Sequence, residues 1–236
     1  MKLLGTHRSK SPRADEGKTS ENTAARDQND GSPEWSLERQ MLLNQYDRAF
    51  TELMSRLGPG PKSEILETLN PILNQLSPEL RAWSGDARLR AHLLMKEILK
   101  VLDDPACTAS SLGILALLLS EGGVSALEMA RPMFKDKVLA MYREPKFVNE
   151  WTVPRVLLML EDYDPKLLES LMKDMIHTWD EERFNSAHHL IASKEIEQRG
   201  LKGSMKGFLR GEIARTGNER DNTGLERAVE LYQEVR

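Results

Sequence analysis

The stretch Leu112-Gly113-Ile114-Leu115-Ala116-Leu117-Leu118-Leu119 places no polar side chain on any face of a helix. Leucine keeps its rotamer freedom in a helix, whereas Val and Ile, which favour strands, are sparse in this chain. A helix that is apolar all round is stable only where other elements cover it. The stretch therefore predicts a buried central helix, and its length of about eight residues is too short to span a bilayer.

Apolar residues on both sides of this stretch recur at spacings of three and four, which is the period of one helix face. The first of these apolar stripes contains Leu42, Tyr46, Phe50 and Leu53. No alternating strand pattern with a hairpin turn accompanies the stripes. The sequence therefore predicts an all-α protein, with further helices over residues 65–76, 89–101, 125–141, 156–160, 167–176, 184–196 and 201–213 and from residue 225 onward.

Residues that cap or break helices mark the ends of these segments. Ser32-Pro33 begins the first helix, because serine accepts from an orphan N–H and proline has no N–H to leave unpaired. Gly58-Pro59-Gly60-Pro61 ends it. Asp104 and Asp164, each followed by proline, are predicted to be N-caps.

Three further helix starts have the pattern of a capping box, in which Ser or Thr precedes Glu by three residues. Prolines inside two of the segments, Pro71 and Pro132, predict kinks. The capping boxes run from Ser125 to Glu128, from Thr178 to Glu181 and from Thr223 to Glu226.

An acidic residue followed by proline recurs at 104–105, 144–145 and 164–165, where one helix ends and the next begins. Helix pairs of about forty residues are the unit of HEAT- and armadillo-like stacks. The sequence therefore predicts stacked helical hairpins, either as a HEAT/armadillo-like solenoid or as an irregular helical bundle. Residues 32–236 are expected to form one domain, with a weaker boundary near 198–203. Residues 1–31 are polar and predict a disordered tail.

The composition excludes several classes of protein. A net charge of −4 argues against a protein that coats nucleic acid along its whole surface. A single cysteine, Cys107, cannot form an intrachain disulfide, which favours a reducing compartment. The apolar start Met1–Leu4 is too short for a signal peptide. A cytoplasmic or nuclear protein without a membrane span is therefore expected, and a homo-oligomer is compatible with the sequence.

The region 199–211 carries a stripe of basic residues at helical spacing with no acid among them. Glycines at 203, 207 and 211 lie beside it, although Gly costs about 1 kcal/mol relative to Ala in a helix. The alternatives are a flexible linker and a site for a polyanion such as nucleic acid, in which the side chains contact phosphates. The candidate polyanion-binding residues are Arg199, Lys202, Lys206 and Arg210.

The region 161–182 is acidic, with eight Asp and Glu against two Lys. General acid–base catalysis needs a buried or coupled carboxylate in a cleft, and nothing in the sequence indicates one. The region is therefore interpreted as a solvated acidic face, with an interaction surface for a basic partner as the alternative. The candidate residues of this acidic face are Glu161, Asp162, Asp164, Asp180, Glu181 and Glu182.

No motif for catalysis, metal binding or cofactor binding is present. His177, Glu181 and His188 are residues of metal-ligand types, but on one helix Glu181 and His188 would lie about 10 Å apart along the axis. His177 is instead expected to end a helix. The segment 199–211 lacks the P-loop pattern. Cys107 is expected to be a small buried apolar residue rather than a reactive thiolate.

These observations favour a non-enzymatic protein–protein interaction scaffold or adaptor, with no cofactor and no metal, whose partner the sequence does not identify. The alternative is an RNA- or DNA-associated helical protein, of the translation-factor or viral-assembly-factor type, that uses the basic stripe over 199–210.

Overall fold

A computed structural model describes residues 33–56, 59–76, 85–144, 147 and 151–235 of the chain. All regular elements within these ranges are helices, which confirms the prediction of an all-α protein. The predicted disordered tail, residues 1–31, and the predicted cap Ser32 lie outside the described residues.

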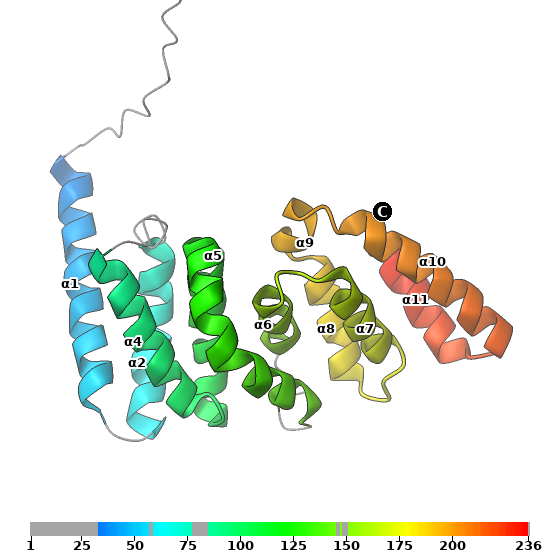
Figure 1. Ribbon diagram of the computed structural model, residues 1–236, viewed down its shortest axis with the longest axis horizontal. Coiled ribbons are helices and arrows are strands. Elements are labelled where there is room, and N and C mark those ends of the chain that lie inside the picture. Colours follow the sequence, from blue (N-terminus) through cyan, green and yellow to red (C-terminus); the bar gives the residue numbers. More distant parts are fainter. Residues whose placement is uncertain (1–32, 57–58, 77–84, 145–146, 148–150, 236) are drawn as a thin grey trace, which may run out of the picture.

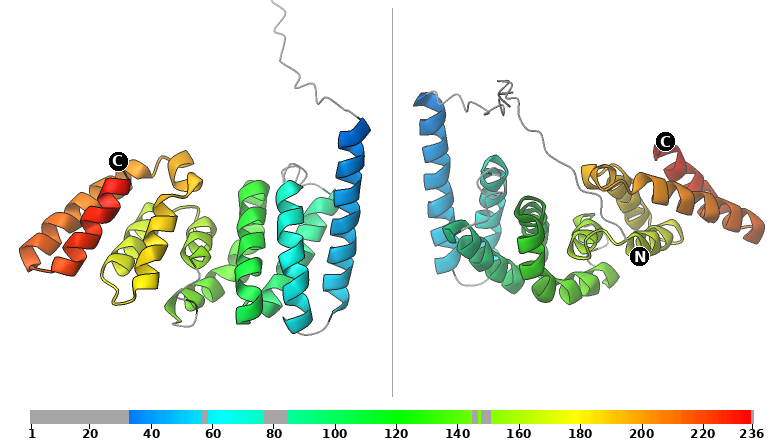
Figure 2. Two further views of the ribbon diagram at one scale, coloured as in Figure 1. Left: turned by 180° about the vertical axis from the view of Figure 1, so that it is seen from behind. Right: turned by 45° about the horizontal axis from the view of Figure 1, so that its top comes forward.

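The helices follow one another in space in nearly the order of the sequence (Figure 1). Helices α1, α2 and α4 pack at one end beside α5, and the pair α10 and α11 forms the other end. A second view shows that the row is curved (Figure 2). The helices are α1 (Pro33–Ser55), α2 (Pro59–Gln75), α4 (Gly85–Val101), α5 (Pro105–Arg143), α6 (Thr152–Leu160), α7 (Pro165–Ile176), α8 (Glu181–Ile191), α9 (Lys194–Gln198), α10 (Lys202–Glu219) and α11 (Asn222–Glu234).

Helix α5 is the centre of the core, as the apolar stretch 112–119 predicts. Leu112, Ile114, Leu115 and Leu118 are fully buried, and α5 packs against α2, α4 and α6. Among the described residues, α5 is also long and apolar enough to cross a bilayer by length and composition. The core helix of a soluble protein has the same properties, so the absence of a membrane span stays a prediction.

Backbone geometry divides α5 in two at Gly123. The residue has φ 55° and ψ −142°, a combination that essentially only glycine adopts without strain. The predicted helix start at Ser125 therefore follows a real break, although the break lies inside one element. The helices continue through Pro71 and Pro132, so the break in α5 comes from a glycine and not from the proline at which the sequence predicts a kink.

The predicted aspartate caps are confirmed. The Asp104 carboxylate accepts from the Ala106 N–H at 2.9 Å, and the Asp164 carboxylate accepts from the Lys166 N–H at 3.1 Å. Proline follows each cap, as expected for the first position of a helix. Helix α2 likewise begins at Pro59, so the predicted breaker after α1 also contributes the first residues of α2.

Two of the predicted capping boxes are wrong in register. The N-cap of α8 is Asp180, which accepts from the N–H groups of Glu182 and Arg183 at 3.0 and 3.2 Å. The N-cap of α11 is Asp221, which accepts from the Gly224 N–H at 2.9 Å. In both cases an aspartate near the predicted threonine takes the cap, in accordance with the stronger capping preference of aspartate.

Candidate functional site

The segment 202–219 is a helix, α10, and the linker alternative is therefore wrong for these residues. Lys202, Lys206 and Arg210 lie on it at intervals of about one turn. Lys202 pairs with Glu197 at 3.2 Å, and the Arg210 Nε donates to the Tyr232 hydroxyl at 2.8 Å. Among the described residues, the Lys206 side chain has no hydrogen-bond or ion-pair partner. The glycines beside the stripe are exposed, and a methyl group added at any of them would meet nothing within 4 Å.

Arg199, the fourth basic candidate, is separated from the other three. It lies at the end of α9, before α10 begins, and its Nη1 is 2.8 Å from the Asp162 carboxylate. The guanidinium also packs over the Tyr163 ring, 5.0 Å from the ring centre. The structure therefore brings one residue of the basic stripe together with one residue of the acidic face.

Most of the acidic candidates make contacts inside the fold. Asp164 and Asp180 are helix caps. Within the described part of the chain, Glu182 alone of the six has neither a capping role nor an ion pair. The remaining three pair with other elements: Glu161 with Lys135 at 2.5 Å, Asp162 with Arg199 at 2.8 Å, and Glu181 with Arg227 at 2.7 Å.

Trp179, in the connection between α7 and α8, is completely exposed, with a relative exposure of 101%. It precedes the acidic first turn of α8, where Glu181 and Glu182 are also exposed. A tryptophan near a helix end more often closes a core than binds a ligand. The described structure leaves this indole fully in solvent, where it is available to a partner.

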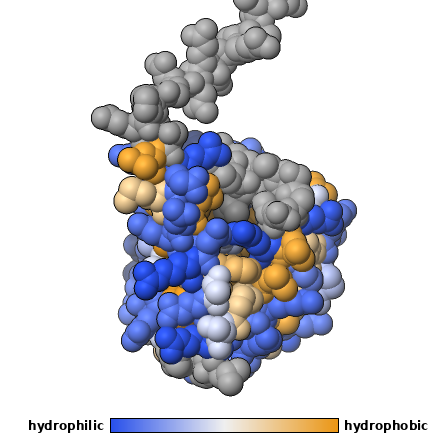
Figure 3. Space-filling model, turned by 90° about the vertical axis from the view of Figure 1, so that its left-hand side faces the viewer, coloured by the Kyte–Doolittle hydropathy of each residue, from blue (hydrophilic) through white to orange (hydrophobic). Residues whose placement is uncertain are grey.

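Other exposed apolar side chains are scattered. At the α1 end the surface is mostly hydrophilic, with separate apolar areas (Figure 3). Leu37 and Met41, one turn apart on α1, are 63% and 53% exposed and form a small apolar pair. A small group of exposed apolar residues is ordinary on a protein surface, whereas a fully exposed tryptophan is not.

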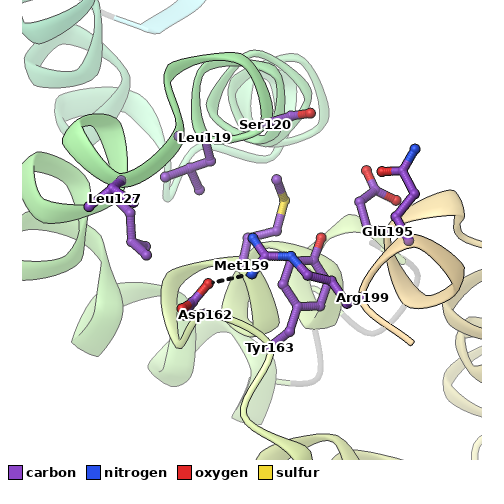
Figure 4. Close-up of a pocket in the computed structure, with 11 residues that line it drawn as sticks. Leu119, Ser120, Leu127, Met159, Asp162, Tyr163, Glu195 and Arg199 are labelled. Atoms are coloured by element: carbon purple, nitrogen blue, oxygen red, sulfur yellow. Dashed lines mark hydrogen bonds and ion pairs between the residues drawn. The ribbon is translucent and has the colours of Figure 1, made fainter. Parts of the chain in front are cut away.

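A cleft of about 260 Å³ lies where the break in α5 faces the end of α6 and the short helix α9. Figure 4 shows side chains from all three elements turned toward it, with Tyr163 and Arg199 near its middle. The sequence did not indicate this cleft, because the residues that line it are far apart in the chain. The cleft is lined by Leu119, Ser120, Gly123, Val124, Leu127, Met159, Asp162, Tyr163, Glu195, Gln198 and Arg199.

The backbone around this cleft adopts rare conformations. Asp162 and Tyr163 have φ angles of 51° and 58°, in the left-handed region that disfavours a large side chain. They follow the end of α6, where the Tyr163 N–H donates to the Leu158 carbonyl at 2.7 Å. Glycine usually fills this position after a helix. A tyrosine held there indicates that its side chain serves a purpose besides ending the helix.

Polar groups in and beside the cleft are incompletely paired. Tyr163 is 5% exposed, and within the described structure its hydroxyl has no hydrogen-bond partner. Burial, reinforced by the charge of Glu195, raises the pKa of this hydroxyl, so it stays a donor at neutral pH. Glu195 itself forms an ion pair with Arg155, whose buried Nε likewise lacks a partner among the described residues.

His177 ends α7, as predicted, and connects it to the last two helices. Its two ring nitrogens lie 3.0 and 3.1 Å from carboxylate oxygens of Glu212 on α10 and Asp221, the cap of α11. Burial alone would raise the pKa of Glu212, but hydrogen bonds from Arg215 and His177 hold it below its ordinary value. These contacts are those of a structural junction between helices.

Cys107 is fully buried, and burial together with the charge of Asp104 raises the pKa of its thiol. The interpretation as a small buried apolar residue is therefore confirmed. Within the residues that the structure covers, no group of three or more His, Cys, Asp or Glu is arranged to hold a metal ion.

No family model, no curated protein and no solved structure matches this chain. No family is therefore assigned, and the geometry of Trp179, of α10 and of the cleft is what bears on function.

Proposed function

We propose that this chain is a non-enzymatic α-helical scaffold or adaptor that binds a protein partner through Trp179. The observation that carries the proposal is the complete exposure of the Trp179 indole. Tryptophan is enriched among the residues that dominate binding energy at protein interfaces. The carboxylates of Glu181 and Glu182 beside it favour a partner surface with basic residues.

The scaffold proposal includes an architecture of stacked helical hairpins. Supporting it, α7 packs with α8, α10 packs with α11, and the two pairs contact each other. The Arg227 guanidinium of α11 strengthens the contact between the two helix pairs. It donates to the Ile176 carbonyl of α7 at 3.2 Å and pairs with Glu181 of α8. A curved row of such pairs presents extended surfaces to a partner, which suits an adaptor in the cytoplasm or nucleus.

Trp179→Ala is expected to reduce capture of the partner at least about tenfold while leaving the melting temperature unchanged. The indole touches solvent, so its removal costs the fold less than about 0.5 kcal/mol, whereas truncation of an interface hot spot costs about 2 kcal/mol or more. The measurement is affinity purification followed by mass spectrometry, with Trp179→Ala compared to the parent protein.

Leu37→Ala is the matched control, because Leu37 is exposed but belongs to α1 at the other end of the row. The control is expected to retain every partner that the parent protein retains. Equal capture by the parent protein and Trp179→Ala would contradict the proposal.

The second candidate function is binding of a nucleic acid by α10. The specific observation in its favour is that Lys206 is unpaired within the described structure while exposed glycines leave the neighbouring backbone open. Basic side chains at this spacing, about 6 Å along the helix, match neighbouring backbone phosphates. Such binding would be weak and would not depend on sequence, because no side chain nearby is arranged to read bases.

Changing Lys202, Lys206 and Arg210 together to Glu tests this candidate. If α10 binds nucleic acid, the triple variant loses RNA binding in a filter assay and keeps its melting temperature, since exposed charges contribute little to stability. The parent protein is then expected to show a salt dependence no steeper than about −2.7 in log–log slope on duplex DNA, from three phosphate contacts. Absence of RNA binding by the parent protein contradicts the candidate.

A further inference from the structure

Three features coincide at the cleft between the α5 break, the end of α6 and α9. The cleft is concave, with a volume of about 260 Å³. Its backbone is held in rare conformations at Gly123, Asp162 and Tyr163. A covered tyrosine hydroxyl at its centre has no partner within the described structure. A buried hydroxyl that is left unpaired is costly, so a group that accepts from Tyr163 is expected to complete the site.

The cleft retains hydrogen-bond donors that have no partner within the described structure. The Arg199 guanidinium has five N–H donors, and its contact with Asp162 is made by Nη1, so most of the donors have no partner among the described residues. Figure 4 shows this guanidinium lying across the Tyr163 ring. The charges of both carboxylates are compensated, that of Asp162 by Arg199 and that of Glu195 by Arg155. The unpaired Tyr163 hydroxyl and the remaining N–H groups of Arg199 favour a ligand that supplies hydrogen-bond acceptors.

The cleft also has apolar lining residues, Leu119 and Leu127 from α5 and Met159 from α6. A cavity of about 150 Å³ accommodates benzene, so this volume suits a ligand of roughly eight to ten non-hydrogen atoms. We propose that the cleft binds a carboxylate attached to a short apolar chain, with the carboxylate on Arg199 and the Tyr163 hydroxyl and the chain against the leucines. This site is independent of the Trp179 surface.

Hexanoate is the probe for this proposal, with hexanol as the neutral control of equal chain length. We expect hexanoate to bind the full chain with a Kd of about 1 mM, a value in keeping with its size. Hexanol is expected to bind at least about tenfold more weakly, because its neutral hydroxyl cannot form an ion pair or a bidentate contact with Arg199. Ligand-detected NMR measures both. Equal binding of the two probes, or of neither, would overturn the proposal.

The chain offers a matched pair of controls. Arg210 and Tyr232 repeat the Arg–Tyr arrangement of the cleft, with the guanidinium 5.6 Å from the ring centre, but they lie outside the cleft. We expect Tyr163→Phe and Arg199→Gln each to weaken hexanoate binding about tenfold, and Tyr232→Phe and Arg210→Gln to leave it unchanged. Tyr163→Phe removes only an unpaired hydroxyl, so its melting temperature is expected to equal or exceed that of the parent protein. Unchanged hexanoate binding by a folded Tyr163→Phe variant would overturn the proposal.

The same carboxylate chemistry is found in free small acids and in the carboxyl terminus of a peptide. Acetyl-Gly-Leu with a free carboxyl terminus and the same peptide with an amidated terminus distinguish these sources. Tighter binding of the free-terminus peptide than of hexanoate assigns the site to a peptide terminus, and weaker binding assigns it to a small acid. Equal binding of the amidated and free peptides contradicts a role for the carboxylate.

Discussion

Leu115→Asp is expected to abolish cooperative folding. Leu115 is fully buried in the centre of α5, which packs against α2, α4 and α6. A carboxylate at this position would lose its hydration without gaining a partner. The cost is several kcal/mol, a large part of the total stability of about 5–15 kcal/mol for a typical domain. Circular dichroism melting and gel filtration measure the loss.

Ala109→Asp is the control, because Ala109 is exposed on the same helix, close to its N-terminus. The charge stays in solvent at this position and the substitution costs at most about 0.7 kcal/mol of helix propensity, so this variant is expected to melt within a few degrees of the parent protein. If Leu115→Asp remained soluble and melted cooperatively, α5 would be a partner-binding surface instead of the core.

The central helix and the aspartate caps were predictable because they depend on local chemistry. The stretch 112–119 offers no polar face, so burial follows from the hydrophobic effect whatever the neighbours are. Asp104 and Asp164 act on N–H groups two residues away, which the sequence displays directly. The caps of α8 and α11 were misplaced because a threonine and an aspartate compete within three residues, and the pattern alone does not decide between them.

The ion pairs between helices could not be predicted from local chemistry. Arg199 and Asp162 are 37 positions apart, and only the packing of α9 beside the end of α6 brings them within 2.8 Å. The stripe of four basic residues therefore becomes three residues on α10 and one in a cleft. Spacing along one helix gives no information about ion pairs formed between helices.

The left-handed backbone conformation of Tyr163 could have been expected from the sequence. Helix α6 ends at Leu160 without a glycine in the residues that follow, Glu161-Asp162-Tyr163-Asp164. Many helices end with a residue in the left-handed conformation, and where no glycine is available another residue adopts it. The exposure of Trp179 could not have been expected, because a tryptophan before a helix N-cap is compatible with both burial and exposure.

A buried ion pair joins α2 and α4, and removing one of its partners is expected to lower the stability of the fold. The Glu97 carboxylate lies 2.5 Å from the Nζ atoms of both Lys62 and Lys100. The Lys62 and Glu97 side chains are only 7% and 11% exposed, whereas Lys100 is on the surface. Removal of one partner from a buried pair leaves an uncompensated charge, which costs about 3–5 kcal/mol.

Glu97→Gln is therefore expected to lower the melting temperature by roughly 10 °C at pH 7. Burial alone would raise the pKa of Glu97, but hydrogen bonds from Lys100 and Lys62 hold it below its ordinary value of 4.5. A carboxyl group whose pKa is lower in the folded state stabilises the fold above the pKa of the unfolded chain, and this contribution is lost as the pH falls through the folded-state pKa. The difference in melting temperature between the parent protein and Glu97→Gln is thus expected to be largest at neutral pH and to shrink below about pH 4.5.

Glu52→Gln is the matched control for this experiment. Glu52 pairs with Arg56 at 2.9 Å on the surface of α1, where both side chains are about half exposed. An exposed pair of this kind contributes less than about 1 kcal/mol, so the control is expected to melt within a few degrees of the parent protein. Thermal melts of the parent protein and both variants between pH 3 and pH 7 test whether the ion pair accounts for the lower stability. If the melting temperature of Glu97→Gln stayed below that of the parent protein by the same amount across this range, lost packing, and not the ion pair with Lys62, would account for the lower stability.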